Sequence, residues 1–293
     1  VNNKELILPV YFQQKTKQHM FNHFFCPPYD TEKAGLQPGT LGAAATPTDE
    51  YASAFDIKVG QEWKSFDWTH LNEYSEGPWG NRDPRFYASI LYNGANWTGR
   101  QLELYVGGKD GYMDFSTSAS QDYVRTSTTG YIFRKWIRQE AGWERTDGPQ
   151  DFYLMRLADV YLMYAEAVNE TSGPTSECVA LLNKIRSRGN LPALTPDKYA
   201  NSEAFFNAIE QERIVELATE GMRPFDIRRW RKIHDIWGEA NSDGLTLYDT
   251  NGTRIRDEFK NAPELNFQKN YIYQIPENER NRNPNLTQNT PWR

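Results

Sequence analysis

The stretch DFYLMRLADVYLMYAEAVNE, residues 151–170, carries apolar side chains at the spacing of one helix face. Residues three and four positions apart lie on the same side of an α-helix, so such a repeat predicts a helix that buries one stripe. The stretch therefore predicts a helix over residues 151–170. Its stripe is formed by Leu154, Leu157, Ala158, Tyr161, Ala165 and Val168.

The same spacing predicts three more helices, over residues 177–188, 203–220 and 224–237. Gly173-Pro174 separates the first two helices of the series, and Gly189 ends the second, as is typical of a helix C-cap. Four helices in two hairpins follow the logic of tetratricopeptide repeats, although the period of ~34 residues is not kept.

Residues 1–150 differ in character, because they hold 14 of the 20 glycines and many turn signals. They predict a loop-rich part with a short helix at residues 47–55 and a few short strands. The expected strands cover residues 5–12, 86–92, 101–106 and 131–137.

The expected fold class is mainly α, with tetratricopeptide-like hairpins (151–240) packed against the irregular, loop-rich part (1–150). Residues 241–293 lose the helical period and predict an extended tail that wraps the helices. Because aromatic residues make up 14% of the chain, they can build a core where aliphatic residues are few.

The net charge of −6 is divided evenly, with −3 in residues 1–150 and −3 in residues 151–293. Neither half is basic, which disfavours nucleic acid as a partner. No run of about 18 apolar residues is present to span a membrane. Cys26 and Cys178 form no CxxC, zinc-ligand or disulfide-framework pattern; a single distant disulfide is the alternative, but two buried, unpaired thiols are favoured.

The most densely charged segment, residues 210–232, places Glu212, Glu216 and Glu220 on one helix face. Like charges at this spacing repel unless cations lie beside them. An inter-helix ion-pair network is favoured over acid–base or metal chemistry, because no histidine follows at the spacing of a helical di-metal site. The expected cations are Arg156, Arg186, Arg213, Arg223, Arg228 and Arg229.

Motifs for catalysis or cofactors are weak throughout the sequence. His19 and His23 lie four residues apart, but no third ligand accompanies them, so a metal site is not expected. A GxSxG nucleophile motif, a Walker A loop and GxGxxG are all absent from the sequence. No cofactor and no catalytic residue are therefore expected.

Six of the nine tryptophans lie in residues 1–150, and Trp63, Trp68 and Trp79 share the polar stretch 60–86. An indole face suits the C–H face of a sugar ring, while polar neighbours suit its hydroxyl groups, as in pockets with an apolar wall and few polar groups. The alternative is that these rings pack a core that is poor in aliphatic residues.

Several segments, in order, resemble the SusD/RagB family, the surface glycan-binding lipoproteins of starch-utilisation-type systems in Gram-negative bacteria. Family members are usually longer, so the resemblance implies that this chain is the C-terminal part. The matching segments are KELILPV (4–10), PTDEYASAF (47–55), NRDPRFYASILYNG (81–94), TGYIFRKW (129–136), RLADVYLMYAEAVNE (156–170), ALLNKIRSRGNLPAL (180–194), IEQERIVELATEGMRPFDIRRW (209–230) and NPNLTQN (283–289).

The resemblance implies non-catalytic capture of a polysaccharide or oligosaccharide at the outer face of the outer membrane. It also implies docking on a SusC-like TonB-dependent transporter, no cofactor, and membrane attachment only through a lipid anchor upstream of this chain. The expected glycan-binding residues are Trp63, Trp68, Tyr74 and Trp79 for stacking, with Asn72, Glu73 and Asn81 as hydroxyl partners. Structural roles are expected for Glu166, Arg186, Arg213, Glu216, Glu220, Arg223, Asp226 and Arg229.

Two alternative functions stay open. A glycoside hydrolase would use loop carboxylates such as Glu73 with Glu76 or Asp83, and their separation would set the reaction geometry. A helical scaffold without a sugar site would bind proteins on a concave face.

Overall fold

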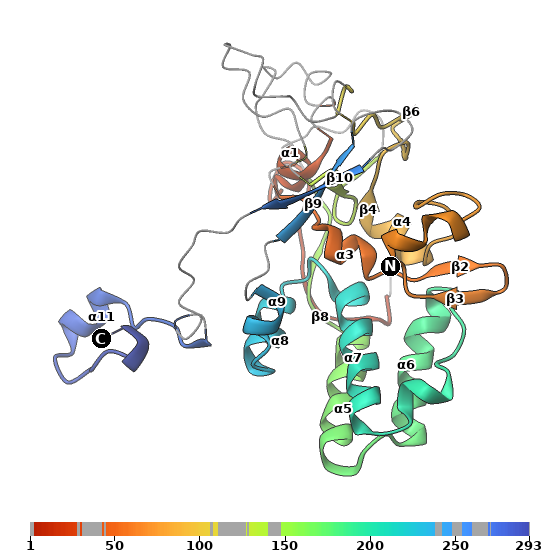
Figure 1. The fold of residues 1–293 in the computed structure, drawn as a ribbon. Coiled ribbons are helices and arrows are strands. Elements are labelled where there is room, and N and C mark those ends of the chain that lie inside the picture. Colours follow the sequence, from red (N-terminus) through yellow and green to blue (C-terminus); the bar gives the residue numbers. More distant parts are fainter. Residues whose placement is uncertain are drawn as a thin grey trace.

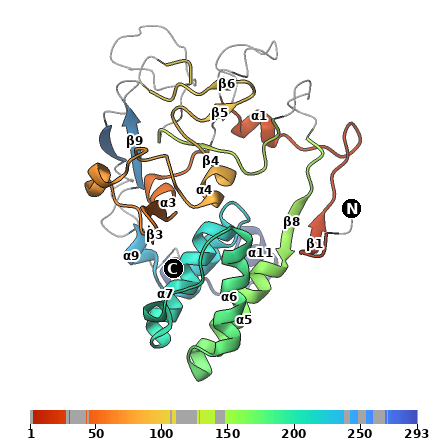
Figure 2. The same ribbon diagram turned by 90° about the vertical axis from the view of Figure 1, so that its right-hand side faces the viewer.

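Three helices form one end of the molecule, and a loop-rich part with short strands lies above them (Figures 1 and 2). The helices are α5 (Leu157–Ser172), α6 (Ser176–Arg188) and α7 (Ser202–Leu217). The computed structural model describes residues 3–27, 30, 43, 45–105, 108–110, 127, 129–139, 148–237, 242–247, 254–259, 269 and 271–292. This arrangement confirms the expected mainly helical, tetratricopeptide-like fold class.

The helical end has its own core, in which α5 packs against both α6 and α7. The expected stripes supply much of it, including Ala158, Ala165, Cys178 and Leu182. Phe205 on α7 is fully buried among them. The short helix η2 (Pro196–Tyr199) connects α6 with α7.

The helix expected over residues 151–170 begins later than its apolar pattern indicates. Residues Phe152–Arg156 form strand β8, which pairs antiparallel with β1 (Leu6–Val10), and α5 starts at Leu157. Leu154 is therefore 46% exposed instead of lying in the buried stripe. Periodicity missed this boundary because the partner strand lies about 145 residues away in the sequence.

Left-handed residues shape the ends of two other helices. Gly189 is the C-cap of α6, as expected, and the next residue, Asn190, is left-handed at φ +57°; the Leu191 N–H donates to the Arg186 carbonyl as in a Schellman cap. A Cβ at Gly189 would lie 3.2 Å from Nε of Arg85, so the glycine makes room for this side chain. The expected helix 224–237 is split by Arg231 at φ +60° into α8 (Arg223–Arg229) and α9 (Ile233–Trp237).

The loop-rich part is built from short helices and short strands, and each described strand pairs with one other strand. Residues 86–92, expected as a strand, are mostly helix α4, because Asp83 caps it and Pro84 occupies its first turn. Val106, at the end of the expected strand 101–106, lies outside the described residues. The other elements are α1 (Phe21–Phe25), α3 (Asp49–Ser53), α4 (Pro84–Ser89), η1 (Trp68–Glu73) and strands β2 (Ile57–Val59), β3 (Glu62–Lys64), β4 (Ile90–Leu91), β5 (Asn96–Trp97), β6 (Arg100–Gln101) and β7 (Ile132–Phe133).

The tail combines extended and helical structure. Strands β9 (Ser242–Leu247) and β10 (Arg254–Phe259) pair antiparallel. Helix α11 (Glu277–Arg282) and the short helix η3 (Thr290–Trp292) follow near the C-terminus (Figure 1). The division of the chain at residues 150 and 240 stays a prediction.

An aromatic cluster joins the loop-rich part to the helical end. Phe86 is fully buried, and its ring centroid lies 5.7 Å from that of Phe55 and 5.4 Å from that of Tyr92. Val215 of α7 belongs to the same core. The two parts of the chain therefore share one continuous packed region.

An ion-pair network lies beside this core, as the sequence predicts. Arg156 contacts Glu216 at 2.6 Å and Glu220 at 2.7 Å, and Arg186 contacts Glu212 at 2.6 Å. The remaining expected arginines make other contacts: Arg213 with Asp159 and Asp226, Arg223 with Glu210, Arg229 with Glu166 and Asp226, and Arg228 with the Pro224 carbonyl, to which its guanidinium donates.

Two further cations of this network come from the loop-rich part and were not expected. Arg85 reaches Glu212 at 2.8 Å and Glu216 at 3.3 Å, and Lys135 reaches Glu220 at 2.5 Å. Burial alone disfavours the charge of Glu216, but the guanidinium groups of Arg156, Arg188 and Arg85 outweigh it and lower the pKa of Glu216 to about 2.

Candidate functional site

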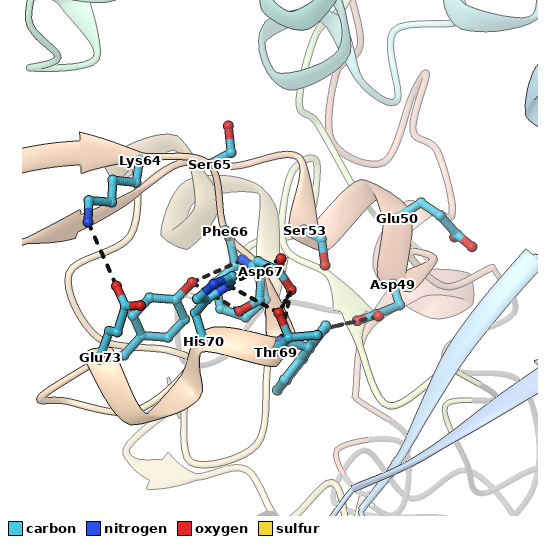
Figure 3. Close-up of a pocket in the computed structure, with 12 residues that line it drawn as sticks. Asp49, Glu50, Ser53, Lys64, Ser65, Phe66, Asp67, Thr69, His70 and Glu73 are labelled. Atoms are coloured by element: carbon cyan, nitrogen blue, oxygen red, sulfur yellow. Dashed lines mark hydrogen bonds and ion pairs between the residues drawn. The ribbon is translucent and has the colours of Figure 1, made fainter.

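A hollow of about 640 Å³ opens between α3, the end of β3 and η1 (Figure 3). We call it the Trp68 hollow. Its size lies within the range of ~300–1,000 Å³ typical of small-ligand sites. It is lined by Asp49, Glu50, Ser53, Lys64, Ser65, Phe66, Asp67, Trp68, Thr69, His70, Glu73 and Tyr74.

The loop that carries η1 is closed by one tyrosine hydroxyl. The Tyr74 hydroxyl donates to the Asp67 carbonyl and accepts from the Asp67 N–H, both at 3.0 Å. The Asp67 carboxylate caps the helix by accepting from the Thr69 N–H at 2.8 Å. These bonds tie together the two ends of η1 and fix the shape of the hollow.

Trp68 is held in a fixed orientation at the wall of the hollow. Its indole N–H donates to both carboxylate oxygens of Asp49, at 3.1 and 3.0 Å. Phe66 and Trp79 contact the ring edge to face, with centroids 5.0 and 5.6 Å away. Because the half-buried ring is already oriented, a ligand that stacks on it orders little more of the protein.

The buried guanidinium of Arg82 supports the loop from beneath. Its carbon lies 3.9 Å from the centroid of the Phe66 ring, and its nitrogens donate to the carbonyls of Pro78 at 3.0 Å and Phe55 at 2.9 Å. Burial lowers the pKa of Arg82 to about 10. Arg82 thus anchors η1 to the segment after α3.

The rim of the hollow is polar and mostly acidic. The Thr69 N–H and hydroxyl, and then the nearby His70, stabilise the charged form of Asp67 and lower its pKa. Lys64 faces Glu73, with Nζ 3.7 Å from Oε2, as Figure 3 shows. This rim offers acceptors, a hydroxyl and an ammonium group that can hydrogen-bond a polyhydroxylated ligand.

The structure brings together part of the expected site. Trp68, Glu73 and Tyr74 all line the Trp68 hollow, although the Tyr74 ring is only 9% exposed and stacks on Phe66. Asn72 is exposed on η1 beside Glu73.

The other expected residues lie outside the Trp68 hollow. Trp79 stacks on Tyr92 at 5.4 Å and contacts Tyr131 edge to face, so much of its surface is used in packing. Asn81 is exposed, with a left-handed backbone at φ +54°. Trp63 lies on β3 and lines a different hollow.

Sequence reasoning missed several residues that line the hollow. Asp67, Thr69 and His70 belong to the same stretch as Trp68, and an Asp followed two residues later by Thr is a local capping signal. Asp49 and Ser53 come from α3 and are brought to the hollow only by the fold. No local pattern links them to Trp68.

A second hollow, of about 340 Å³, lies between the β2–β3 hairpin and the helices α6 and α7. We call it the Trp63 hollow. Gly60, at φ +63°, forms the first position of the two-residue turn that closes this hairpin. The hollow is lined by Asp56, Trp63, Lys64, Ser65, Arg186, Pro192, Ala193, Leu194, Thr195, Lys198, Ala204, Asn207, Ala208, Gln211 and Glu212.

Asp56 is the carboxylate of this second hollow that the structure perturbs most clearly. Burial, together with the nearby carboxylates of Asp83 and Glu212, raises the pKa of Asp56 to about 6 against the opposing effect of Arg186 and Arg85. A carboxyl whose folded pKa exceeds its unfolded value of about 3.8 stabilises the fold only when protonated. Its contribution is therefore lost as the pH rises from about 4 to 6.

Replacing Asp56 with asparagine is expected to raise the free energy of unfolding at pH 7.5 by about 2 kcal/mol, since a neutral side chain avoids the cost of a buried charge. The gain should vanish near pH 4. Urea unfolding at several pH values measures both effects. Asp197→Asn, at an exposed position of η2, should leave the pH profile almost unchanged. Equal stability of wild type and Asp56→Asn at pH 7.5 would contradict the expectation.

Two other expectations from the sequence concern His19 and the cysteines. The ring nitrogens of His19 contact the Gln150 carbonyl at 3.0 Å and the Phe21 N–H at 3.2 Å. Within the described ranges, no group of three or more His, Cys, Asp or Glu side chains is placed to hold a metal ion. Cys26 and Cys178 are free and buried, which confirms the expectation.

Among the residues whose placement is described, no helix is both long and apolar enough to cross a membrane.

Comparison with known proteins gives a consistent family. The sequence model of the SusD family matches residues 4–292. SusD-like protein P2 of Formosa agariphila is 32% identical over 203 residues, or 61% of this chain and 37% of that protein. A SusD-like protein of Bacteroides ovatus is 26% identical over 171 residues, or 50% and 30% of the two chains. This chain belongs to the SusD family.

Solved structures agree in fold. A SusD-like protein from Bacteroides fragilis superposes with a TM-score of 0.73 at 24% identity, over 99% of this chain and 54% of that chain. A SusD-like carbohydrate-binding protein from the same species gives 0.71 at 21% identity, over 97% and 55%. The present chain spans about half of these structures and a smaller share of the two sequence relatives.

Proposed function

We propose that this chain is a non-catalytic glycan-binding part of a SusD-family protein. In this proposal it captures a polysaccharide or oligosaccharide in the Trp68 hollow. The observation that carries the proposal is the indole of Trp68, which Asp49 holds in place beside a polar rim. One structural relative, from Bacteroides fragilis, is a SusD-like carbohydrate-binding protein, which supports the same class of ligand.

The chemistry of the hollow fits a sugar better than an apolar ligand. A pyranose offers a C–H face to the indole, while its hydroxyl groups both donate and accept hydrogen bonds. Asp67 and Glu73 accept, Lys64 donates, and Thr69 does both. Asn72 on the exposed side of η1 stays a candidate hydroxyl partner, as do Trp79 and Asn81 farther along the loop.

The hydrolase alternative receives less support. Asp83 is 1% exposed, caps α4 and is paired with Arg85 at 2.8 Å, so it is engaged in structure. Glu73 is exposed on η1 and is paired with Lys64 across the rim, so it is not enclosed opposite a second carboxylate as a glycosidase acid would be. Membership of the SusD family adds support for binding without catalysis.

We also propose that the whole protein works at the outer face of the outer membrane and passes its glycan to a SusC-like TonB-dependent transporter. Family membership is the support for this placement. Co-purification of the full-length protein with an outer-membrane transporter tests it, and purification without such a partner from the native membrane would contradict it.

Trp68→Ala is expected to weaken glycan binding at least tenfold, because it removes the oriented stacking surface. Affinity electrophoresis against starch, β-glucan, mannan, xylan and pectin finds the polysaccharide, and calorimetry with its oligosaccharides measures the loss. Trp292→Ala, in η3 of the tail, is the matched control and should bind like wild type. If wild type binds a glycan and Trp68→Ala binds it equally well while remaining folded, the site assignment fails.

A further inference from the structure

We propose that the Trp63 hollow is a second saccharide subsite, and that one oligosaccharide runs from the Trp68 hollow across Lys64 and Ser65 to stack on Trp63. This inference rests on the proposed function. It adds a site formed by the helical end of the chain, where α6, α7 and the segment between them face the β2–β3 hairpin.

Trp63 differs from Trp68 in what its indole contacts. It is half-buried, yet within the described residues its N–H has no hydrogen-bond partner and no aromatic ring packs against it. The N–H groups of Trp68, Trp97, Trp136, Trp230 and Trp292 all donate to protein acceptors. A half-exposed indole with an unused donor is suited to contact a ligand that carries both a C–H face and hydroxyl groups.

The walls around Trp63 combine apolar and polar groups. Pro192, Ala193 and Leu194 form an apolar side, which suits the face of a sugar ring. The carboxylate of Asp56 and the exposed amide of Asn207 make no side-chain hydrogen bond to the described residues. Because half-buried polar groups are normally hydrogen-bonded, the carboxylate of Asp56 is available to a sugar hydroxyl, and the amide of Asn207 is accessible to one from solvent.

The carboxylate of Asp56 also lowers the stability of the fold at neutral pH. A carboxyl whose pKa burial raises to about 6 is unfavourable in the fold at neutral pH, and asparagine would avoid this cost. Ligand sites commonly contain groups that lower the stability of the folded protein. This supports a binding role for the hollow independently of the geometry of Trp63.

The two hollows adjoin each other at the hairpin. Lys64 and Ser65 line both of them, so the same short segment forms a rim of each. In Figure 1 the β2–β3 hairpin lies above α6. A ligand that crosses this rim must be a chain of several sugar units, so the arrangement selects an oligosaccharide over a monosaccharide.

Calorimetry with a length series tests the inference. The probes are the disaccharide to hexasaccharide of the polysaccharide retained in affinity electrophoresis. Wild type is expected to bind the hexasaccharide at least tenfold more tightly than the disaccharide. Trp63→Ala should lose this gain while binding the disaccharide within about twofold of wild type, and Trp68→Ala should weaken both. Asn207→Ala, an exposed substitution that leaves the packing intact, should weaken only the longer chains.

The outcomes separate this inference from the proposed function. If the hexasaccharide binds Trp63→Ala and Asn207→Ala as tightly as wild type, while Trp68→Ala binds it weakly, the second subsite is refuted and the proposed function stands. If wild type binds none of the polysaccharides, the proposed function fails and the second subsite fails with it. Loss of the length gain in both variants supports the second subsite.

Discussion

Replacing Arg156 with methionine is expected to lower the free energy of unfolding by about 3–5 kcal/mol at pH 7. The side chain of Arg156 is 6% exposed and contacts Glu216 at 2.6 Å and Glu220 at 2.7 Å. Methionine fills similar volume but removes a cation that contacts both buried carboxylates. Removing one partner of a buried ion pair costs about this much, because the remaining charge cannot return to water. Urea unfolding followed by circular dichroism measures the loss.

The pH dependence distinguishes this electrostatic cause from lost packing. The cations hold the folded pKa of Glu216 near 2, below its unfolded value of about 4.5. Its stabilising contribution is therefore present above pH 4.5 and is lost as the pH falls toward 2. The difference between wild type and Arg156→Met should narrow over that range. A difference that stays constant from pH 7 to pH 3 would assign the effect to packing.

The matched control for Arg156 is an exposed ion pair. Arg282 contacts Glu279 at 3.3 Å, but its side chain is 77% exposed. Exposed pairs contribute only about 0–1 kcal/mol because water screens them. Arg282→Met is therefore expected to unfold at nearly the same urea concentration as wild type.

Phe86→Ala is expected to destabilise the fold by about 3–5 kcal/mol, because it opens a cavity in the aromatic cluster that supports the Trp68 hollow. Phe86 is fully buried; it lies near Phe55 and Tyr92, and the guanidinium carbon of Arg82 lies 4.6 Å from its ring centroid. Trp79 stacks on it at 6.4 Å. Chemical unfolding measures the loss, and tryptophan fluorescence reports the change around Trp79.

Phe225 provides the control for this core substitution. It is the same residue type on α8, but it is 60% exposed. Phe225→Ala should change the free energy of unfolding by no more than about 0.5 kcal/mol. Equal losses for Phe86→Ala and Phe225→Ala would show that the aromatic cluster does not hold the loop-rich part together.

The parts of the fold that depend on local pattern could be predicted from the sequence. The stripes of α5 and α6 follow the helical period, and residues such as Ala165, Cys178 and Leu182 lie in the core as expected. Strand β8 could not be predicted in this way, because its partner strand β1 lies about 145 residues earlier in the chain. Arg85 could not be assigned to the glutamates of α7, nor Lys135 to Glu220, for the same reason.

The candidate site shows the same limit. Tryptophans set among polar residues predicted the loop of Trp68, and Glu73 and Tyr74 lie with it in one hollow. The contact of Trp68 with Asp49 spans 19 residues and depends on how α3 packs. Trp63 was grouped with Trp68 by proximity in sequence, but the hairpin turns it toward the helices. Composition thus located the loop, while the face that each ring presents depends on tertiary structure.

The position of Arg85 limits how this chain can vary in evolution. Its guanidinium comes from the loop-rich part, lies against Gly189 at the end of α6 and is paired with Glu212 and Glu216 of α7. A genetic crossover near residue 150 between distant relatives would combine halves whose charges and glycine did not arise together. Such a hybrid could bury the guanidinium of Arg85 without Glu212 and Glu216 beside it. It could also place a side chain at position 189, in the space that this guanidinium occupies. We therefore expect such hybrids to be less stable than either parent, even though the two halves differ in composition.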